Sequence, residues 1–388
     1  MKRRKVIQHG VIGSAAFLAS FSIQNNKIEQ VFASVNMKDK QHYDWIILYW
    51  MPYDNDLSPL GDPILQMLAR GVQNDNILVV VQCDFLGAKS LSRRIITKGK
   101  VEVQQLNTAN SASEQAFAEY LSWANSRFVA NKWAIAFLGH GGHLDKISPG
   151  VYTGTVQLET QWMNIKKVSD AITNFHKEIN SRVELFFFQN CNKGTIEAHY
   201  TFRDVANYTL SSQKLLGAPN YYYESLLQFV GGNSEINGGQ LAEKIIEFER
   251  SDMYRSYTVT DNRYVRELPA KLNPLIDQIT SSKLKALNRK ELKFYTYQDE
   301  DFIDVVLLIK AIANQASETK KNCDEFVDFF KSSIIYKYQQ NPDRVNSELS
   351  GLGLFLPRRK LDLQKYRYLP VFSDLKLVEL FNTILFEG

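Results

Sequence analysis

The chain has 388 residues, with 46 lysines and arginines against 42 aspartates and glutamates, which gives a formal net charge of +4. Hydrophobic residues make up 44% and charged residues 23%, as in ordinary folded soluble proteins. These values exclude a disordered chain, a collagen and a small domain held by disulfides.

The positive charge lies at the N-terminus, because residues 1–33 hold five basic residues and one acid. Lys2–Lys5 precedes an apolar run, Val11–Ile23, and a small-residue exit follows at Val31–Ala33, as in a secretory signal. The run is too short to cross a bilayer comfortably. We expect export by a bacterium, to the medium or the cell envelope, with no stable membrane association after removal of a signal peptide over residues 1–33. An uncleaved anchor is the alternative, and Arg3-Arg4 leaves the Sec and twin-arginine routes open.

The segments that follow alternate between strands and helices. Buried strands are predicted at Asp44–Trp50, Asn76–Gln82, Lys132–Leu138 and Val183–Phe188, a short strand at Tyr208–Ser212, and a hairpin at Ser92–Ile96 and Val101–Leu106. Helices are predicted at Ser111–Phe128, where Ser111 and Glu114 have capping-box spacing, at Ser169–Ile179 and at Gly194–Ala206. This order predicts an α/β fold with a mainly parallel sheet covered by helices.

The pattern changes after residue 230. Helices are predicted at Gly239–Ser251, Val265–Ser281, Asp301–Ser317 and Cys323–Gln340, with strands at Ser256–Thr260 and Gly351–Leu356. We therefore expect a core over residues 34–230 and a C-terminal region over residues 231–388. That region is either a helical subdomain or a continuation packed on the same sheet.

Two of the predicted strands end in a potentially reactive side chain. One runs into Gly139-His140-Gly141-Gly142 and the other into Gln189-Asn190-Cys191. The interval between His140 and Cys191 has room for a crossover helix and a return strand, which would make the two strands parallel. Because ligand sites in such sheets lie at the carboxyl ends of the strands, His140 and Cys191 are expected to face one crevice.

Such a pair suits attack on an amide. A thiolate is the nucleophile, and a nearby imidazole promotes its formation and protonates the leaving amine. The oxyanion that forms needs backbone N–H donors, for which Gly141 and Cys191 are the natural candidates. A helix that begins just after Cys191 would add a favourable dipole.

The other cysteines and histidines are weaker candidates. Cys83 and Cys323 lie inside apolar segments and are expected to be buried, and three cysteines do not make a disulfide framework. His143 is a rival base, whereas His176 and His199 fall in predicted helices. The sequence has no cluster of histidine, cysteine and acids with zinc spacing, so we expect no metal ligands and no required cofactor.

The arrangement of strand-His-Gly, about 50 residues, and strand-x-x-Cys resembles the caspase-like cysteine peptidases. The flanking segments are similar to those of the clostripain family: an asparagine-containing turn at Tyr49–Leu57, a glutamate-containing helix in Cys191–Glu197 and a serine-containing strand end at Ser211–Gln213. Later segments also match, at Tyr221–Tyr223, Ser256–Asp261, Phe302–Asp304 and Ser350–Pro357, so the resemblance covers roughly residues 43–360.

The resemblance implies a caspase-like α/β/α sandwich, a dyad of His140 and Cys191, and endopeptidase action on peptides or proteins, commonly after basic side chains. It implies a specificity pocket at Gln189, Ser211 and Ser212, and maturation by internal cleavage, for which Lys146, Lys166 and Lys167 are candidates. Calcium is associated with some members, and the acids available for it here are Asp54, Asp56, Asp299, Glu300 and Asp301. We expect a monomer that does not bind nucleic acid, because the charges after residue 33 are interleaved in sign.

The chain departs from the family at one position in the expected pocket. Members usually carry an acid two residues before the cysteine, where a carboxylate pairs with a cationic substrate side chain. Here the residue is Gln189, which puts the basic preference and self-cleavage after lysine in question. The alternative function is an inactive caspase-like binding or surface protein.

Overall fold

The computed structural model describes residues 40–152, 159–179, 182–282, 284, 286–345 and 349–386. The expected signal segment, residues 1–33, lies outside the described residues. None of the helices in the described part of the chain has the length and apolar character needed to cross a lipid bilayer.

A nine-stranded sheet forms the centre of the molecule, in the order β13-β10-β9-β8-β5-β1-β2-β3-β4. Its parallel part comprises β1 (Gln41–Tyr53), β2 (Ile77–Phe85), β5 (Phe128–Leu138), β8 (Val183–Gln189) and β9 (Ala206–Ser211). Antiparallel strands extend both edges, namely β3 (Ser92–Thr97), β4 (Lys100–Gln105), β10 (Ser256–Asp261) and β13 (Ile335–Gln340). The predicted mainly parallel sheet is therefore confirmed.

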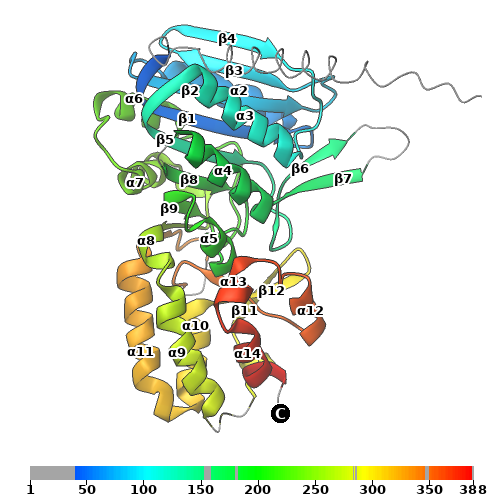
Figure 1. Cartoon of the computed structure of the whole chain (residues 1–388), viewed down its shortest axis with the longest axis vertical. Helices are drawn as coiled ribbons and strands as arrows, with labels where there is room; N and C mark the ends of the chain where they lie inside the picture. Colours follow the sequence, from blue (N-terminus) through cyan, green and yellow to red (C-terminus); the bar gives the residue numbers. More distant parts are fainter. Residues whose placement is uncertain are drawn as a thin grey trace, which may run out of the picture.

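Helices cover both faces of this sheet (Figure 1). Residues alternate along β1, so that Ile46, Leu48 and Trp50 belong to one hydrophobic core while Ile47, Tyr49 and Met51 belong to the other. The first core includes residues of α3 (Glu114–Arg127), α4 (Ile165–Ile179) and α5 (Ile196–Phe202). The second includes residues of α2 (Ser58–Gly71), α6 (Tyr223–Gly232) and α7 (Gly238–Phe248). This is the expected α/β/α sandwich.

The chain beyond residue 231 takes part in the same architecture. It supplies β10 and β13 to the central sheet, and the helices α8 (Asn262–Val265), α9 (Leu268–Ser281), α10 (Val305–Gln315) and α11 (Lys320–Phe329) below it (Figure 1). A second sheet follows the order β11-β12-β14, formed by β11 (Phe294–Tyr297), β12 (Glu300–Asp304) and β14 (Gly353–Phe355). The chain ends in α12 (Lys360–Gln364), α13 (Pro370–Asp374) and α14 (Leu377–Phe381). Strands of the central sheet therefore come from both sides of the expected division at residue 230.

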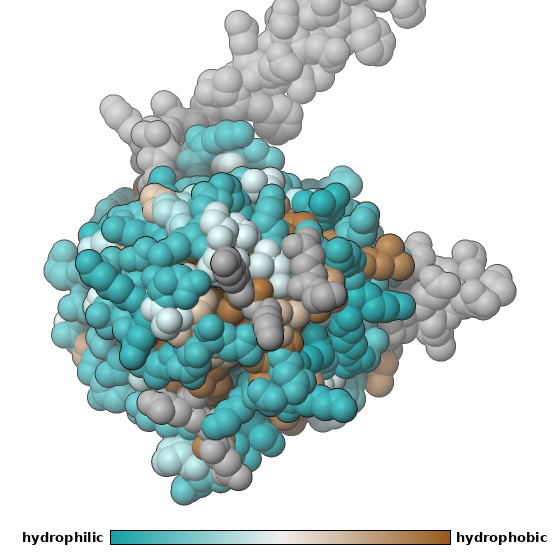
Figure 2. Space-filling view, turned by 90° about the horizontal axis from the view of Figure 1, so that it is seen from below, coloured by the Kyte–Doolittle hydropathy of each residue, from teal (hydrophilic) through white to brown (hydrophobic). Residues whose placement is uncertain are grey.

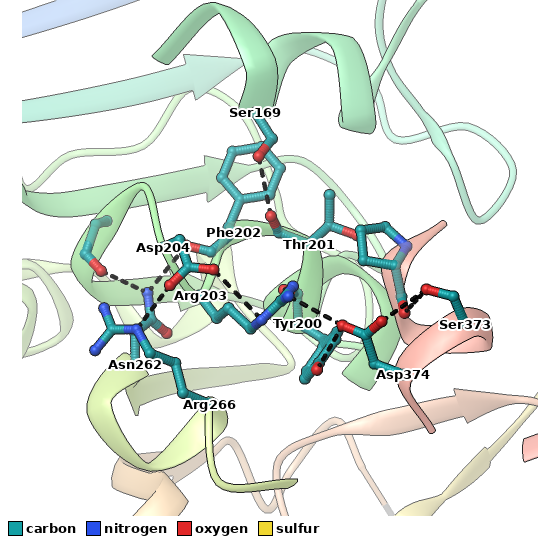
Figure 3. A network of polar contacts seen from close by, with 12 residues as sticks. Ser169, Tyr200, Thr201, Phe202, Arg203, Asp204, Asn262, Arg266, Ser373 and Asp374 are labelled. Atoms are coloured by element: carbon teal, nitrogen blue, oxygen red, sulfur yellow. Dashed lines mark hydrogen bonds and ion pairs between the residues drawn. The ribbon is translucent and has the colours of Figure 1, made fainter. Parts of the chain in front are cut away.

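A polar network joins this C-terminal region to the end of α5 (Figure 3). The Tyr200 hydroxyl donates to Asp374 over 2.9 Å, and the Arg203 guanidinium reaches the same carboxylate over 3.1 Å. The Arg266 guanidinium donates to Asp204 over 2.8 Å. Because α5 follows Cys191 in the chain, these contacts fix the helical region relative to the segment that carries the cysteine.

The surface at the lower end of the molecule is mostly hydrophilic (Figure 2). Apolar residues appear there only in small separate areas, and scattered exposed apolar side chains are normal for a folded protein.

Several predicted elements differ from those in the structure. The helix expected to be capped by Ser111 begins at Glu114 and is capped by Ser113, while the Glu114 carboxylate accepts a bond from the Asn164 amide. The helix expected over Asp301–Ser317 is preceded by a strand, β12. The helix expected over Cys323–Gln340 ends earlier, because its last residues form β13 and pair with β10. Sheet pairing outweighs helical propensity in both places.

Candidate active site

The carboxyl ends of β5 and β8 meet at one edge of the sheet. The two strands are parallel neighbours. Leu138, the last residue of β5, is paired with Gln189, the last residue of β8. His140 and Cys191 each follow two residues later, and both line one pocket. The predicted crossover is confirmed. It contains the hairpin of β6 (Lys146–Tyr152) and β7 (Glu159–Asn164), followed by α4.

Glycines allow the two strand ends to approach each other. Gly139 has a φ of 111°, a conformation that residues with a side chain rarely adopt. A Cβ atom on Gly141 would overlap the carbonyl group of Cys191 and lie 3.1 Å from its amide nitrogen. The loop after His140 is therefore packed against the backbone of the cysteine. The buried Asn190 side chain strengthens this contact by donating to the Gly139 carbonyl over 2.9 Å.

The two histidines of this loop are paired with acids. His140 Nε2 lies 2.8 Å from Asp56 Oδ1, and His143 Nε2 lies 2.8 Å from Asp299 Oδ1. Both pairs are open to solvent, since 40% of the His140 side chain and 77% of the Asp56 side chain are exposed. His143 is not among the residues that line the pocket of Cys191, which favours His140 as the base.

The Cys191 sulfur is partly buried beside three polar groups. Its thiol donates to the Leu216 carbonyl over 3.6 Å, and its Sγ accepts from the Leu216 amide over 3.4 Å. Burial raises the pKa of the Cys191 thiol, and the Leu216 amide, the Tyr297 hydroxyl and the Lys193 ammonium act in the opposite direction. The net effect of the surroundings is to raise the pKa of this thiol.

Lys193 and Tyr297 were not predicted from the sequence as parts of this site. Lys193 is fully buried, and its ammonium donates to the carbonyl oxygens of Gly142, His143 and Leu144 over 3.2, 2.6 and 3.3 Å. Tyr297, at the end of β11, donates its hydroxyl to the Gly141 carbonyl over 2.6 Å. For Lys193, the only local signal of a role in the site was that it is the one charged residue between Gln189 and Ile196, two residues after the cysteine.

Gln189 lines the pocket, and three side chains bond to its amide. Its Nε2 donates to Asn220 and, over 2.7 Å, to the Tyr223 hydroxyl, and its Oε1 accepts from the Tyr222 hydroxyl over 2.7 Å. The remaining lining comes largely from uncharged residues, among them Tyr53, Leu57 and Ala218. No carboxylate lines this pocket within the described residues.

Two further expectations concern neighbouring residues. Ser211 and Ser212 are not among the residues that line the pocket. Ser211 is buried in β9 and bonds His199 Nε2 over 2.6 Å, and the Ser212 hydroxyl accepts from the Lys214 amide. The helix expected from Gly194, just after Cys191, begins at Ile196, after a turn.

The candidate processing residues lie in regular structure. Lys146 is the first residue of β6, and its amide donates to the His143 carbonyl over 2.9 Å. Lys166 and Lys167 lie in the first turn of α4, where the Lys166 ammonium is 2.6 Å from Asp170. The segment between β6 and β7, residues 153–158, lies outside the described residues. Cleavage at these lysines stays a prediction.

The acids considered for calcium are dispersed. The described residues contain no group of three or more histidine, cysteine or acidic side chains arranged to hold a metal ion. Asp56 and Asp299 pair with histidines, Glu300 accepts from the Leu144 amide, and Asp301 accepts from Arg289 and Arg358. Calcium binding at these acids stays a prediction, and no step below passes through a metal.

Comparisons with known proteins identify the family. The sequence profile of the clostripain family matches residues 49–378. Among solved structures, the chain is similar to a secreted C11 cysteine protease from Bacteroides thetaiotaomicron in complex with an irreversible peptide inhibitor, with a TM-score of 0.65 and 16% identity over 86% of this chain and 98% of that chain.

The chain is also similar to an inactive zymogen of a C11 protease from Parabacteroides distasonis, with a TM-score of 0.62 and 15% identity over 86% of this chain and 98% of that chain. A search of curated proteins gives no match. At these identities the structural likeness concerns the fold, whereas the profile spans most of the sequence. The chain belongs to the clostripain family and is a cysteine-type endopeptidase.

Proposed function

We propose that this peptidase uses Cys191 as its nucleophile and His140 as its general base and acid. The observation that carries this assignment is the placement of both side chains in one pocket, at the ends of adjacent parallel strands. Gly141 lies against the Cys191 backbone. The two amides of these residues are therefore the proposed donors for the oxyanion.

The proposed reaction has two halves. His140 takes the thiol proton of Cys191, and the thiolate attacks the carbonyl carbon of the scissile amide. The oxyanion collapses, the C–N bond breaks, and His140 gives its proton to the leaving amine. A water molecule then loses a proton to His140 and attacks the thioester, which releases the carboxylic acid and restores the thiol.

The dyad is tested by comparing the mature wild-type protein with Cys191→Ala on a mixed peptide library. We expect cleavage by the wild type and none by Cys191→Ala. Cys323→Ala is the control, because Cys323 is a buried cysteine of α11 and should remain dispensable for turnover. Equal cleavage by wild type and Cys191→Ala would refute the assignment.

We also propose that the pocket favours an uncharged side chain before the scissile bond. A lysine or arginine entering it would lose water and find the neutral Gln189 at the base, whose amide is already bonded to tyrosines and Asn220. The same library profile tests this preference. Dominant cleavage after lysine or arginine would contradict it.

Export is the last part of the proposal. It is supported by the three-part pattern of residues 1–33. Expression of the full chain in a bacterium should give a mature protein outside the cytoplasm whose intact mass has lost about 33 residues. Retention of the full-length mass in the cytoplasmic fraction would oppose it.

A further inference from the structure

A second cavity adjoins the pocket of Cys191 at His140. Within the described residues, His140 is the only residue that lines both cavities. The second cavity has a volume of about 340 Å³, whereas the pocket of Cys191 has about 160 Å³. Its other lining residues, which define what is named the Trp162 cavity below, are Asn55, Asp56, Pro149, Gly150, Trp162 and Gln298. The two cavities therefore meet at the proposed general base and acid.

The hairpin of β6 and β7 forms an apolar wall of the Trp162 cavity. It projects from the central sheet (Figure 1) and supplies Pro149, Gly150 and Trp162 to the lining. Pro149 and Trp162 are cross-strand partners, so their side chains lie on the same face of the hairpin. The indole also packs on Gly142, where a Cβ atom would lie 2.8 Å from two of its ring carbons. The position of the aromatic ring is thus fixed by the loop after His140.

Backbone contacts hold this wall close to His140. The Ser148 amide donates to the His140 carbonyl over 3.0 Å, and the Ser148 hydroxyl donates to the Leu138 carbonyl over 2.9 Å. Ser148 is fully buried and directly precedes Pro149. The hairpin wall and the segment that carries the imidazole therefore form one hydrogen-bonded unit.

The proposed acid step determines which part of a substrate can reach the Trp162 cavity. His140 gives its proton to the leaving amine, so the residue that contributes this nitrogen must lie beside His140. The carbonyl side of the scissile bond lies with Cys191 and Gln189 in the first pocket. The Trp162 cavity is lined by His140 and not by Cys191, which assigns it to the leaving-group side.

The lining suits an uncharged and bulky side chain. Trp162 and Pro149 offer apolar surface, and a pair of aromatic rings gains more than its buried area alone provides. A lysine or arginine is unfavourable because His140 becomes a cation when it takes the thiol proton, and a second cation beside it opposes that step. An acidic side chain would meet the Asp56 carboxylate, which already pairs with His140 over 2.8 Å.

We propose that the Trp162 cavity binds the side chain of the first residue after the scissile bond and selects an aromatic or large aliphatic one. The inference rests on the proposed roles of Cys191 and His140 and adds the leaving-group half of the substrate to them. Trp162 determines this selection, because it is the largest apolar side chain in the lining.

The test uses peptides that are identical up to the scissile bond and carry phenylalanine, leucine, alanine, lysine or glutamate immediately after it. Values of kcat/KM are compared for the mature wild type, Trp162→Ala, Trp162→Phe and Gln161→Ala. Gln161 is the exposed neighbour of Trp162 on β7 and faces the other side of the strand, where it bonds Asn110, so its replacement is a matched control. A methyl ester of the same acyl portion has no residue after the scissile bond and reports on Cys191 and His140 alone.

We expect the wild type to cleave the phenylalanine and leucine peptides with about tenfold higher kcat/KM than the alanine, lysine and glutamate peptides. Trp162→Ala should reduce this preference to about twofold and leave cleavage of the methyl ester unchanged, because only the wall of the cavity is lost. Trp162→Phe and Gln161→Ala should keep the preference. A wild-type preference for lysine or glutamate would overturn the proposal. An equal loss of methyl ester cleavage in Trp162→Ala would also overturn it, since Trp162 would then only support His140.

The two proposals fail in different ways. Equal cleavage by wild type and Cys191→Ala would refute the assignment of the nucleophile. If Cys191→Ala does not cleave, calorimetric binding of the same peptides to it reports on the cavity without turnover, and the phenylalanine peptide should bind about tenfold more tightly than the alanine peptide. Equal affinities would overturn the inference while the nucleophile stands. If Cys191→Ala cleaves, the kcat/KM values of Trp162→Ala still decide the role of the cavity.

Discussion

Glu249 is a buried carboxylate next to Asn220, which lines the pocket of Cys191, and its replacement by glutamine gives a pH-dependent test of the structure. It caps the C-terminal end of α7, where the negative end of the helix dipole opposes a negative charge. The amides of Tyr221 and Arg250 donate to its Oε1, and its side chain also contacts Asn220 of the pocket. Its Oε2 has no hydrogen-bond partner among the described residues.

Burial raises the pKa of Glu249 from 4.5 to about 7, against the effect of these hydrogen bonds. Because the pKa is higher in the folded state, its contribution to stability is fully present below pH 4.5 and is lost as pH rises through 7. At about 1.4 kcal/mol for each unit, the buried ionised group costs about 3 kcal/mol at pH 8 and less than about 1 kcal/mol at pH 5. A glutamine avoids this cost but leaves an amide N–H unbonded, at about 1 kcal/mol.

We therefore expect Glu249→Gln to raise the free energy of unfolding by about 2 kcal/mol at pH 8 and to leave it nearly unchanged at pH 5. Urea unfolding at the two pH values measures both numbers. Glu247→Gln is the control, since Glu247 is exposed on the same helix and forms only a surface pair with Lys244, so its effect should be small at both pH values. Stabilisation of Glu249→Gln by the same amount at pH 5 and pH 8 would refute the reasoning.

Three further predictions concern the pocket and its loop. Gln189→Glu places a carboxylate among hydroxyl and amide partners and should increase cleavage after lysine or arginine at least about tenfold relative to uncharged residues, as a library profile would reveal. Asp56→Asn should lower kcat/KM less than about tenfold, because the pair with His140 is exposed; a loss above a hundredfold would make Asp56 a third essential member. Lys193→Met should cost about 3 kcal/mol of stability in urea unfolding by removing the ammonium donor of the buried Gly142 and Leu144 carbonyl oxygens, and wild-type stability would contradict this.

The placement of His140 and Cys191 was predictable because it depends on local patterns and one topological rule. The apolar strands before His140 and Cys191 are short and buried, and the length of the crossover requires them to be parallel. The glycine at position 141 was likewise interpretable, since a backbone amide that must approach a reacting group favours a residue without a side chain. Each of these inferences needs only residues that are close in sequence or lie at equivalent strand ends.

The specificity pocket was predicted less well, because its walls depend on how a later loop returns to the sheet. Gln189 is the last residue of β8 and lines the pocket, as expected. The Ser211 side chain bonds His199, and the Ser212 hydroxyl accepts from a backbone amide. The wall of the pocket is formed by Leu216, Gly217, Ala218 and Asn220. Strand alternation decides which face a side chain takes, and a shift of one residue reverses it.

The hairpin that carries Tyr297 could not be placed from the sequence at all. Tyr297 and Gly141 are 156 residues apart in the chain, and no periodicity links them. The contact arises because β14, which pairs with β12, also contacts the chain just after Cys191, where Gly353 bridges Thr195 and its amide donates to the Gly194 carbonyl over 2.8 Å. Residues from both sides of the expected division at residue 230 therefore contact the loop after His140. The loop after His140 is held by Lys193 from the core and by Tyr297 and Glu300 from beyond residue 231, so both parts of the chain determine the geometry of the proposed oxyanion donor.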